Sequence, residues 1–279
     1  MAKISFALIH NNNQERYLYV QSHISELMSD LSKLHDIHFY EIAYQNEIRP
    51  LNLLIVILRD LAILKLERDW RRYRILNQNS FLRQLLGLLK LIWLTKRYKK
   101  GGGWFRKSTI ETIVTSKHIR AWDVCLETDS DYLIVFEDDV IFKKDSISRI
   151  RELLKSISEL DKNNLVYVDL AGGVQRQDLM LRKLQSSQDN YYRYYCLPVT
   201  NTACCYFVNR KVIESFHEII CLKPGLRFLP IDWMINKLFI MMSNLGLNWF
   251  CAHADPSVFS HGTFSGEYVS WQKYEDKRG

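Results

Sequence analysis

Three consecutive carboxylates, Glu137, Asp138 and Asp139, follow a short apolar run at residues 132–136 (YLIVF). The run is β-branched and aromatic and has an aspartate directly before it, which predicts a buried β-strand. Desolvating three adjacent acids at the end of such a strand is costly unless a cation or a hydrogen-bond donor compensates. In open α/β sheets, ligands bind outside the carboxyl ends of the strands. The triplet therefore predicts a metal and phosphate site.

The spacing of the acids suits a hard divalent cation. Glu137 and Asp139 stand one residue apart, and carboxylate oxygens are the ligands that Mg²⁺ and Mn²⁺ prefer. A cation there would offset the negative charge that grows on a leaving diphosphate. Acidic triplets also occur in solvated turns and as helix caps, and this plainer interpretation stays open.

The flanking segments predict an α/β fold. Residues 4–9 and 37–43 read as strands, and the amphipathic stretch 14–34 between them reads as a helix, which gives a βαβ unit and hence parallel strands. A helix over 108–127 precedes the acidic strand, and Ser108 and Glu111 have capping-box spacing at its start. Further strands are expected at 165–170, 202–208 and 249–252, and further helices at 147–160, 209–220 and 233–245.

Length and composition fit a single globular α/β domain over 1–279 in a cytosolic protein. The chain has 279 residues, 47% hydrophobic and 25% charged. No secretory signal is evident at the start, no apolar run is long enough to span a membrane, and the six cysteines form no CxxC pair. Reduced thiols are therefore expected.

A basic segment at 49–107 interrupts the α/β rhythm. It holds 15 Lys and Arg against three acids, a net charge of +12, whereas the remainder carries −5. Three interpretations are open: a helical insertion packed on the core, an in-plane surface for anionic lipid, and a nucleic-acid site. No nucleic-acid motif accompanies the charge, so the first two are favoured, and no nucleic-acid partner is expected.

The stretch from Thr115 to Phe142 (TSKHIRAWDVCLETDSDYLIVFEDDVIF) resembles the central signature of glycosyltransferase family 25, the bacterial lipooligosaccharide galactosyltransferase family. The likeness extends to residues 4–16, 202–216 and 230–232. The chain departs from the family pattern in its basic insertion and in an extra residue between Ser116 and His118. The resemblance implies a GT-A-like, Rossmann-type mixed sheet flanked by helices, into which 49–107 is inserted as a basic helical segment.

The resemblance also implies roles for the acids. Glu137 and Asp139 would hold Mn²⁺ or Mg²⁺, and Asp138 would orient the ribose or the donor sugar. His261 is the expected additional metal ligand from the tail, although a plain surface histidine, or His253 in its place, remains open.

Further residues are expected at the donor and acceptor. Asn11, Asn12 and Arg16 follow the first strand and are expected to contact the nucleotide, while Asn13 is a candidate helix cap. The family is inverting, so one carboxylate must deprotonate the acceptor; Asp232, at a helix start that stabilises an anion, is the candidate base, with a simple N-cap as the alternative. His118 reads as a satisfied core histidine.

Together these features predict a metal-dependent transferase that moves a hexose, expected to be galactose, from a nucleotide sugar, expected to be a UDP-sugar. The acceptor would be a lipid-linked or cell-surface glycan, reached at the inner face of the cytoplasmic membrane through the basic segment. Two alternatives are a non-catalytic, membrane-associated glycan-binding or scaffold protein with the same fold, and a nucleotidyltransferase. The polar loop 10–16 (HNNNQER) lacks the Gly-rich phosphate loop of the latter.

Overall fold

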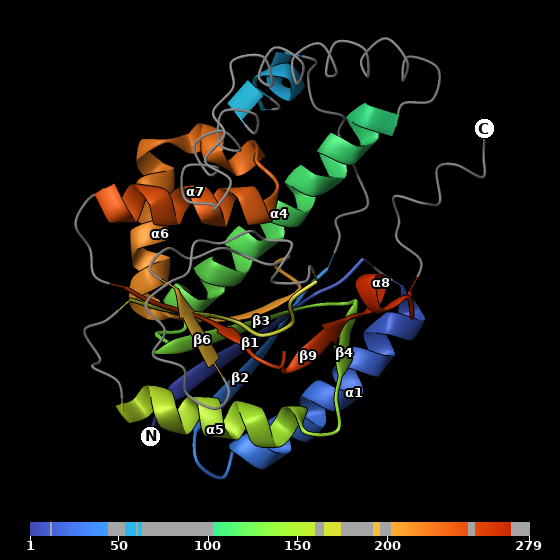
Figure 1. Cartoon of the computed structure of the whole chain (residues 1–279), viewed down its shortest axis with the longest axis vertical. Coiled ribbons are helices and arrows are strands. Elements are labelled where there is room, and N and C mark those ends of the chain that lie inside the picture. The colour runs from blue at the N-terminus through green and yellow to red at the C-terminus, as the bar shows by residue number, and fades with distance from the viewer. Residues whose placement is uncertain are drawn as a thin grey trace.

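A seven-stranded mixed sheet forms the centre of the molecule (Figure 1). The computed structural model describes residues 1–11, 13–43, 54–59, 61–62, 103–159, 165–173, 192–195, 202–244 and 249–268. The order of the strands is β2-β1-β3-β7-β5-β8-β6. Their bounds are β1 Lys3–Ile9, β2 Asp36–Ile42, β3 Tyr132–Glu137, β5 Leu165–Asp169, β6 Tyr192–Tyr195, β7 Cys205–Asn209 and β8 Trp249–Ala254.

The sheet divides into a parallel half and a mixed half. Strand β1 pairs in parallel with both β2 and β3, so the carboxyl ends of these three strands meet at one edge. Strand β7 runs antiparallel to β3 and β5, while β8 is parallel to β5 and antiparallel to β6. The central strands β3, β5 and β7 are apolar along nearly their whole length because both faces of the sheet are covered.

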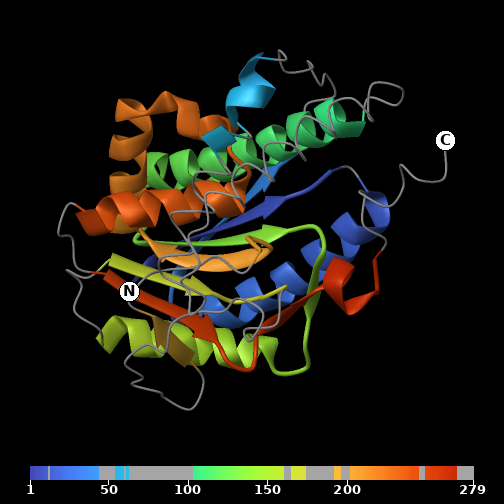
Figure 2. The same cartoon turned by 45° about the horizontal axis from the view of Figure 1, so that its top comes forward.

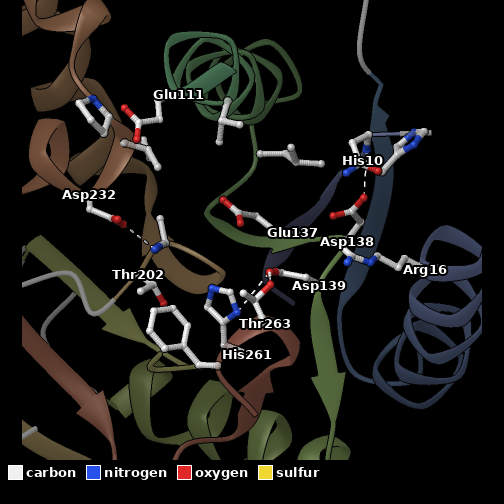
Figure 3. A pocket seen from close by; sticks show the side chains of 17 residues that line it. His10, Arg16, Glu111, Glu137, Asp138, Asp139, Thr202, Asp232, His261 and Thr263 are labelled. Carbon is white, nitrogen blue, oxygen red and sulfur yellow. Dashed lines mark hydrogen bonds and ion pairs between the residues drawn. The ribbon is translucent and has the colours of Figure 1, made fainter. Parts of the chain in front are cut away.

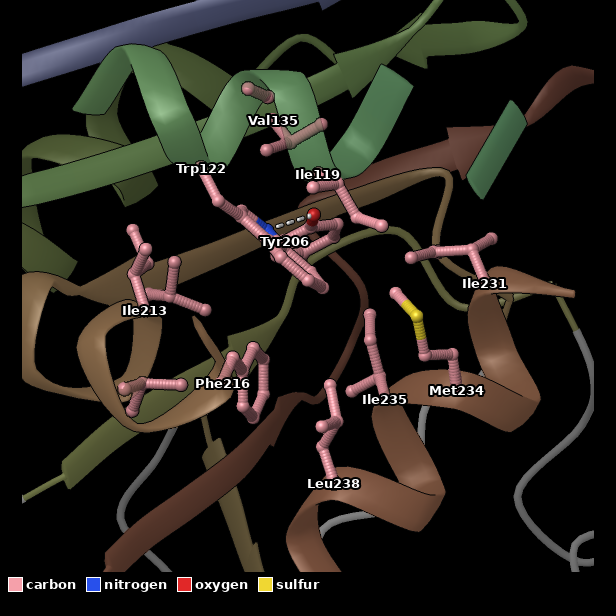
Figure 4. Close-up of a cluster of buried hydrophobic side chains, with 14 of the residues drawn as sticks. Ile119, Trp122, Val135, Tyr206, Ile213, Phe216, Ile231, Met234, Ile235 and Leu238 are labelled. Carbon is pink, nitrogen blue, oxygen red and sulfur yellow. Dashed lines mark hydrogen bonds between the residues drawn. The ribbon is translucent and has the colours of Figure 1, made fainter. Parts of the chain in front are cut away.

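Helices cover both faces of this sheet (Figure 2). Helices α4, α6 and α7 lie on one face, and α1 and α5 lie on the other. Figure 4 shows part of the first layer, where the aromatic rings of Trp122, Tyr206 and Phe216 are fully buried. The bounds are α1 Gln14–Leu31, α4 Gly103–Glu127, α5 Ser146–Glu159, α6 Arg210–Leu222, α7 Ile231–Asn244 and a 3₁₀ helix, η2, at Pro224–Phe228.

A second, two-stranded sheet lies beside the carboxyl end of β3. It pairs β4 (Val140–Phe142) antiparallel with β9 (Phe259–His261), and the short helix α8 (Gly262–Ser265) follows. This small sheet places the C-terminal segment beside the acidic triplet.

The predicted α/β class and the opening βαβ unit are confirmed. Strands β1 and β2 are parallel and flank α1 in sequence, and the Asn13 side chain accepts a hydrogen bond from the Arg16 N–H, so Asn13 caps α1. The Asn209 side chain likewise caps α6 by accepting from Val212 N. Hydrophobic periodicity was sufficient for these elements because each has one apolar face toward the sheet.

The predicted start of the helix before β3 is wrong. Helix α4 begins at Gly103, so Ser108 lies inside the helix and its capping-box spacing with Glu111 has no capping role. The motif is short, and here the residues before it continue the helix. Glu111 instead forms an ion pair with Arg59.

Most of the basic segment 49–107 lies outside the described residues. A short helix at 54–59 is described, and its buried Arg59 donates to the Phe228 carbonyl oxygen at 2.8 Å as well as pairing with Glu111. This part of the segment is packed on the core. None of the described helices is long and apolar enough to cross a membrane.

Candidate functional site

A cavity of about 330 Å³ opens at the carboxyl ends of β1 and β3 (Figure 3). Its walls come from segments far apart in the sequence: the ends of β1 and β3, helix α4, the residues before β7, the start of α7, and the β9–α8 segment. The polar lining residues are His10, Asn11, Arg16, Glu111, Glu137, Asp138, Asp139, Thr202, Asp232, His261 and Thr263. One cavity thus brings together the acidic triplet, Asp232 and His261. Glu137 and His261 are 124 residues apart in the sequence.

The three acids of the triplet contact three different parts of the fold. Glu137 ends β3, and its Oε1 lies 2.9 Å from His118 Nε2 on α4. Asp138 turns toward the loop after β1, where its Oδ2 accepts from the Asn11 backbone N–H at 3.1 Å. Asp139 faces the C-terminal segment. The turn between β3 and β4 therefore spreads the acids around the cavity.

Asp139 and His261 are brought together by the small sheet. In its register Val140 is opposite His261, and the Gly262 N–H donates to the Asp139 carbonyl oxygen at 2.7 Å. His261 Nδ1 lies 3.2 Å from Asp139 Oδ2, and Thr263 Oγ1 donates to the same oxygen at 3.0 Å. Asp139 is thus held by two residues of the C-terminal segment.

The donor atoms around Asp139 fit a divalent cation. Asp139, His261 and the Cys204 thiol bring their ligand atoms within 4.8 Å of one another. Although His261 Nδ1 is buried beside a carboxylate oxygen, it makes no hydrogen bond to any of the described residues. A buried imidazole nitrogen that makes no hydrogen bond and lies beside a carboxylate oxygen is well placed to bind a metal ion together with that oxygen.

The Cys204 thiol acts as a hydrogen-bond donor to Asp139, with Sγ 3.3 Å from Oδ1. Burial and the neighbouring Asp139 and Glu137 raise the pKa of this thiol well above its ordinary value. The thiolate is the metal-binding form, so a hard-cation site here would rest on carboxylates and the imidazole.

Burial dominates the electrostatics of the cavity. It raises the pKa of Glu137, which the adjacent Asp139 raises further, and it raises the pKa of Asp138 to about 6 in spite of the Asn11 hydrogen bond. Lys117 is almost fully buried behind them, where its ammonium donates to the His10 carbonyl oxygen at 3.1 Å; burial lowers its pKa to about 7. Concentrated acids with raised pKa values are typical of functional sites.

Asp232 lies on the opposite wall of the cavity, in the first turn of α7 (Figure 3). Its Oδ1 accepts from the Ala203 backbone N–H at 2.7 Å. Burial, followed by the charge of Glu137, raises its pKa to about 6. The helix start was expected to stabilise the anion, but desolvation and the nearby acid outweigh that effect.

The nucleotide candidates lie where the first strand ends. Asn11 and Arg16 line the cavity, and the Arg16 guanidinium lies over the Tyr268 ring at 4.4 Å. Asn12 lies outside the described residues. His253, the alternative to His261, is buried in β8 opposite Asp169 of β5.

Several cavity neighbours did not emerge from sequence reasoning. His10 and Thr263 lie in segments read only as loops, and Thr202 and Cys204 lie in a segment read as a strand. His118 was read as a satisfied core histidine, and both of its ring nitrogens are indeed hydrogen-bonded in a fully buried position. One of those partners, however, is Glu137.

Comparison with known proteins gives a match to a family model and likenesses to solved structures. Residues 115–235 match the model of glycosyltransferase family 25, described as an LPS biosynthesis protein. No curated protein matches the chain. Among solved structures it is similar to a glycosyltransferase involved in the glycosylation of the major capsid of PBCV-1, at 8% identity and a TM-score of 0.41 over 98% of this chain and 97% of that chain.

The matched residues run from within α4 to the first turns of α7. They contain the acidic triplet and Asp232, and with them two of the walls of the cavity. The similarity to glycosyltransferase family 25 thus covers residues 115–235, and the chain is a glycosyltransferase.

Proposed function

We propose that this glycosyltransferase is metal-dependent and moves a hexose from a nucleotide sugar to a glycan acceptor with inversion at the anomeric carbon. The observation that carries the proposal is the cavity in which Glu137, Asp138, Asp139 and His261 meet at the end of β3. Galactose as the sugar and UDP as the nucleotide rest on the resemblance to the lipooligosaccharide galactosyltransferases alone.

Glu137, Asp139 and His261 would hold the cation, with Mn²⁺ suited to a mixed set of carboxylates and imidazole. The bound ion would supply positive charge beside the diphosphate that leaves the donor. The raised pKa values of the acids are consistent with such a site, because a cation would restore their ionised form.

The nucleotide would lie against the loop after β1. Arg16 supplies a guanidinium suited to a phosphate, and Asn11 and Asp138 are already joined by a hydrogen bond at the cavity wall. The other carboxylate oxygen of Asp138 does not contact Asn11 and would accept a hydrogen bond from a hydroxyl of the ribose or of the sugar.

Asp232 would act as the general base on the acceptor. Its carboxylate would take the proton of the acceptor hydroxyl as that oxygen bonds to the anomeric carbon, while the bond from this carbon to the diphosphate oxygen breaks and its electron pair leaves with the nucleotide. A pKa of about 6 leaves the group largely ionised at neutral pH and still basic enough to accept a proton.

The metal assignment is tested with Glu137→Ala and Asp139→Ala. Each change should abolish transfer and Mn²⁺ binding while leaving the thermal midpoint within a few degrees of the original, because removal of a buried charge offsets the loss of the hydrogen bonds that each acid accepts. Transfer is measured with a panel of UDP-sugars, UDP-galactose included, and Mn²⁺ binding by calorimetry.

Glu152→Ala is the matched control, since Glu152 is an exposed acid on α5. It should leave transfer and Mn²⁺ affinity unchanged. Full activity in both triplet variants would overturn the metal assignment. If the unsubstituted protein binds Mn²⁺ but transfers no sugar from the panel, the result would instead favour the non-catalytic scaffold.

We also propose that the acceptor is lipid-linked and that the basic segment holds the enzyme at an anionic membrane surface. On the short helix in this segment, Leu54, Leu58 and Leu61 are exposed and recur at helical spacing, whereas Arg59 faces the core. An exposed leucine stripe within a segment of charge +12 has the composition of an in-plane membrane helix.

Replacing Leu54, Leu58 and Leu61 together by Gln should reduce binding to vesicles that contain an anionic lipid at least tenfold, with no loss of thermal stability. Co-sedimentation with vesicles measures the effect. The control replaces Leu18 and Leu34, which are exposed in and just after α1, by Gln. If both variants bind the anionic vesicles equally well, the segment would be a helical insertion packed on the core and not a membrane-binding surface.

A further inference from the structure

A chain of three hydrogen bonds links the core to Glu137. The Trp122 indole nitrogen lies 3.0 Å from the Tyr206 hydroxyl, which lies 3.0 Å from His118 Nδ1. His118 Nε2 lies 2.9 Å from Glu137 Oε1. The side chains of Trp122, Tyr206 and His118 are all fully buried, and Figure 4 shows the first of these contacts.

The direction of the chain follows from what each group can donate. An indole N–H is only a donor, so the Tyr206 oxygen accepts from Trp122. The phenolic proton is then free to be donated to His118 Nδ1. With Nδ1 as acceptor, the neutral imidazole carries its proton on Nε2 and donates it to Glu137 Oε1.

The other protonation states of His118 leave a buried donor unpaired. The Nδ1–H tautomer and the imidazolium would both direct an N–H at the Tyr206 oxygen, which already accepts from Trp122. The phenolic proton would then have no acceptor within the described part of the chain, in a fully buried place. An unpaired buried donor loses its hydration without compensation, so the Nε2–H form is favoured.

We propose that Trp122 and Tyr206 are positioning residues that set the tautomer of His118, and that His118 in turn orients Glu137. Donation from His118 fixes Oε1 and leaves Oε2 for the cavity, where no hydrogen bond from the described residues reaches it. Trp122 and His118 are four residues apart on α4 and so lie on one helix face above Tyr206 of β7.

The consequence for a metal ion rests on the proposed function. If Glu137 is a ligand, a carboxylate already oriented by its outer partner binds the ion more tightly than a mobile one, and loss of such a partner typically costs 10- to 100-fold in affinity. The tautomer itself does not depend on any metal.

The tautomer is tested by ¹⁵N NMR of histidine-labelled, metal-free protein at neutral pH. His118 should show a protonated Nε2 and a hydrogen-bonded, unprotonated Nδ1. In Tyr206→Phe the hydrogen-bond signature at Nδ1 should disappear and the Nε2 proton should exchange with solvent at least tenfold faster. A wild-type spectrum of the Nδ1–H form or of the imidazolium would overturn the proposal.

The effect on Glu137 is tested with two amide substitutions of His118. The amide nitrogen of Gln can occupy the place of Nε2 and keep the donor to Glu137, whereas that of Asn corresponds to Nδ1. Mn²⁺ affinity, measured by calorimetry well below the unfolding midpoint, should fall at least tenfold in His118→Asn and stay within about threefold in His118→Gln. Equal affinities in the two variants would overturn the orienting role.

Tyr167→Phe is the matched control for Tyr206→Phe. Tyr167 is also fully buried, and its ring stacks on that of Tyr206 at 5.6 Å. It should leave the His118 spectrum and Mn²⁺ affinity unchanged; a change equal to that of Tyr206→Phe would make the effect one of general packing. If Glu137→Ala binds Mn²⁺ normally, the proposed function fails, while the spectrum still decides the hydrogen-bond chain.

Discussion

Each acid of the triplet is held by a different kind of partner. Glu137 accepts from a buried imidazole, Asp138 from a backbone N–H, and Asp139 from a thiol and a hydroxyl. Of these hydrogen-bond donors, only the His118 imidazole could carry a positive charge. These hydrogen bonds therefore do not neutralise the acids, and the charge that remains would favour a bound cation.

Asp232 combines a functional role with a cost to stability. Its pKa is about 6 in the folded protein and 3.8 ordinarily, so above pH 6 the folded chain must bury a charge that the unfolded chain exposes to water. The raised pKa therefore lowers stability at neutral and high pH, and this penalty disappears below about pH 4, where both states are protonated.

Asp232→Asn should therefore be more stable than the original protein at pH 8, by on the order of 1–3 kcal/mol, and no more stable at pH 4. The amide oxygen can still accept from Ala203, so the hydrogen bond need not be lost. Urea unfolding with a chelator present measures both values. Transfer should fall at least 100-fold, as expected for loss of a general base. A variant that is less stable at pH 8 would contradict the burial argument.

At the scale of elements, the small sheet of β4 and β9 brings a histidine of the tail to the triplet. Gly262 is central to this contact, because a Cβ at that position would lie 2.8 Å from the Asp139 carbonyl oxygen and would also collide with the Tyr268 ring. Glycine is thus required by the close approach of the two strands' ends.

Gly262→Ala should force β9 away from Asp139. We expect a loss of about 1–3 kcal/mol in the free energy of unfolding and at least a tenfold loss of Mn²⁺ affinity. Chemical denaturation and calorimetry measure the two effects. Gly225→Ala is the control, since a Cβ there meets nothing within 4 Å, and it should change neither quantity. Unchanged Mn²⁺ affinity in Gly262→Ala would remove His261 from the proposed ligand set.

Local patterns predicted the elements well, but contacts distant in sequence far less. The apolar run before Glu137 was enough to predict β3, and the polar loop at 10–16 marked the correct strand end. The proximity of His261 and Asp139 depends on the register of β4 against β9, and no feature of either segment alone specifies that register. The sequence thus offered both His261 and His253, and only the fold places one of them beside the triplet.

At the scale of the whole molecule, the cavity is assembled from residues between Ile9 and Phe264. The acids come from the parallel half of the sheet, whereas Thr202 and Ala203 come from the residues before the antiparallel β7 and Asp232 from the first turn of α7. The parallel half would take the nucleotide and the other wall the acceptor. The cavity cannot form unless both halves of the sheet are folded, so ligand binding should raise the midpoint of global unfolding.

The rate at which the Cys204 thiol is alkylated should report how often this cavity opens. Its thiol is fully buried against Asp139, and only a thiolate reacts rapidly with alkylating reagents, so its modification must wait for an opening of the surrounding structure. The exposed Cys221 should react at once and serve as an internal reference within the same sample. Peptide mapping over time should show Cys204 modified far later than Cys221, and later still with Mn²⁺ added. A delay lengthened by the ion would show that Mn²⁺ keeps the site closed, without any turnover of sugar.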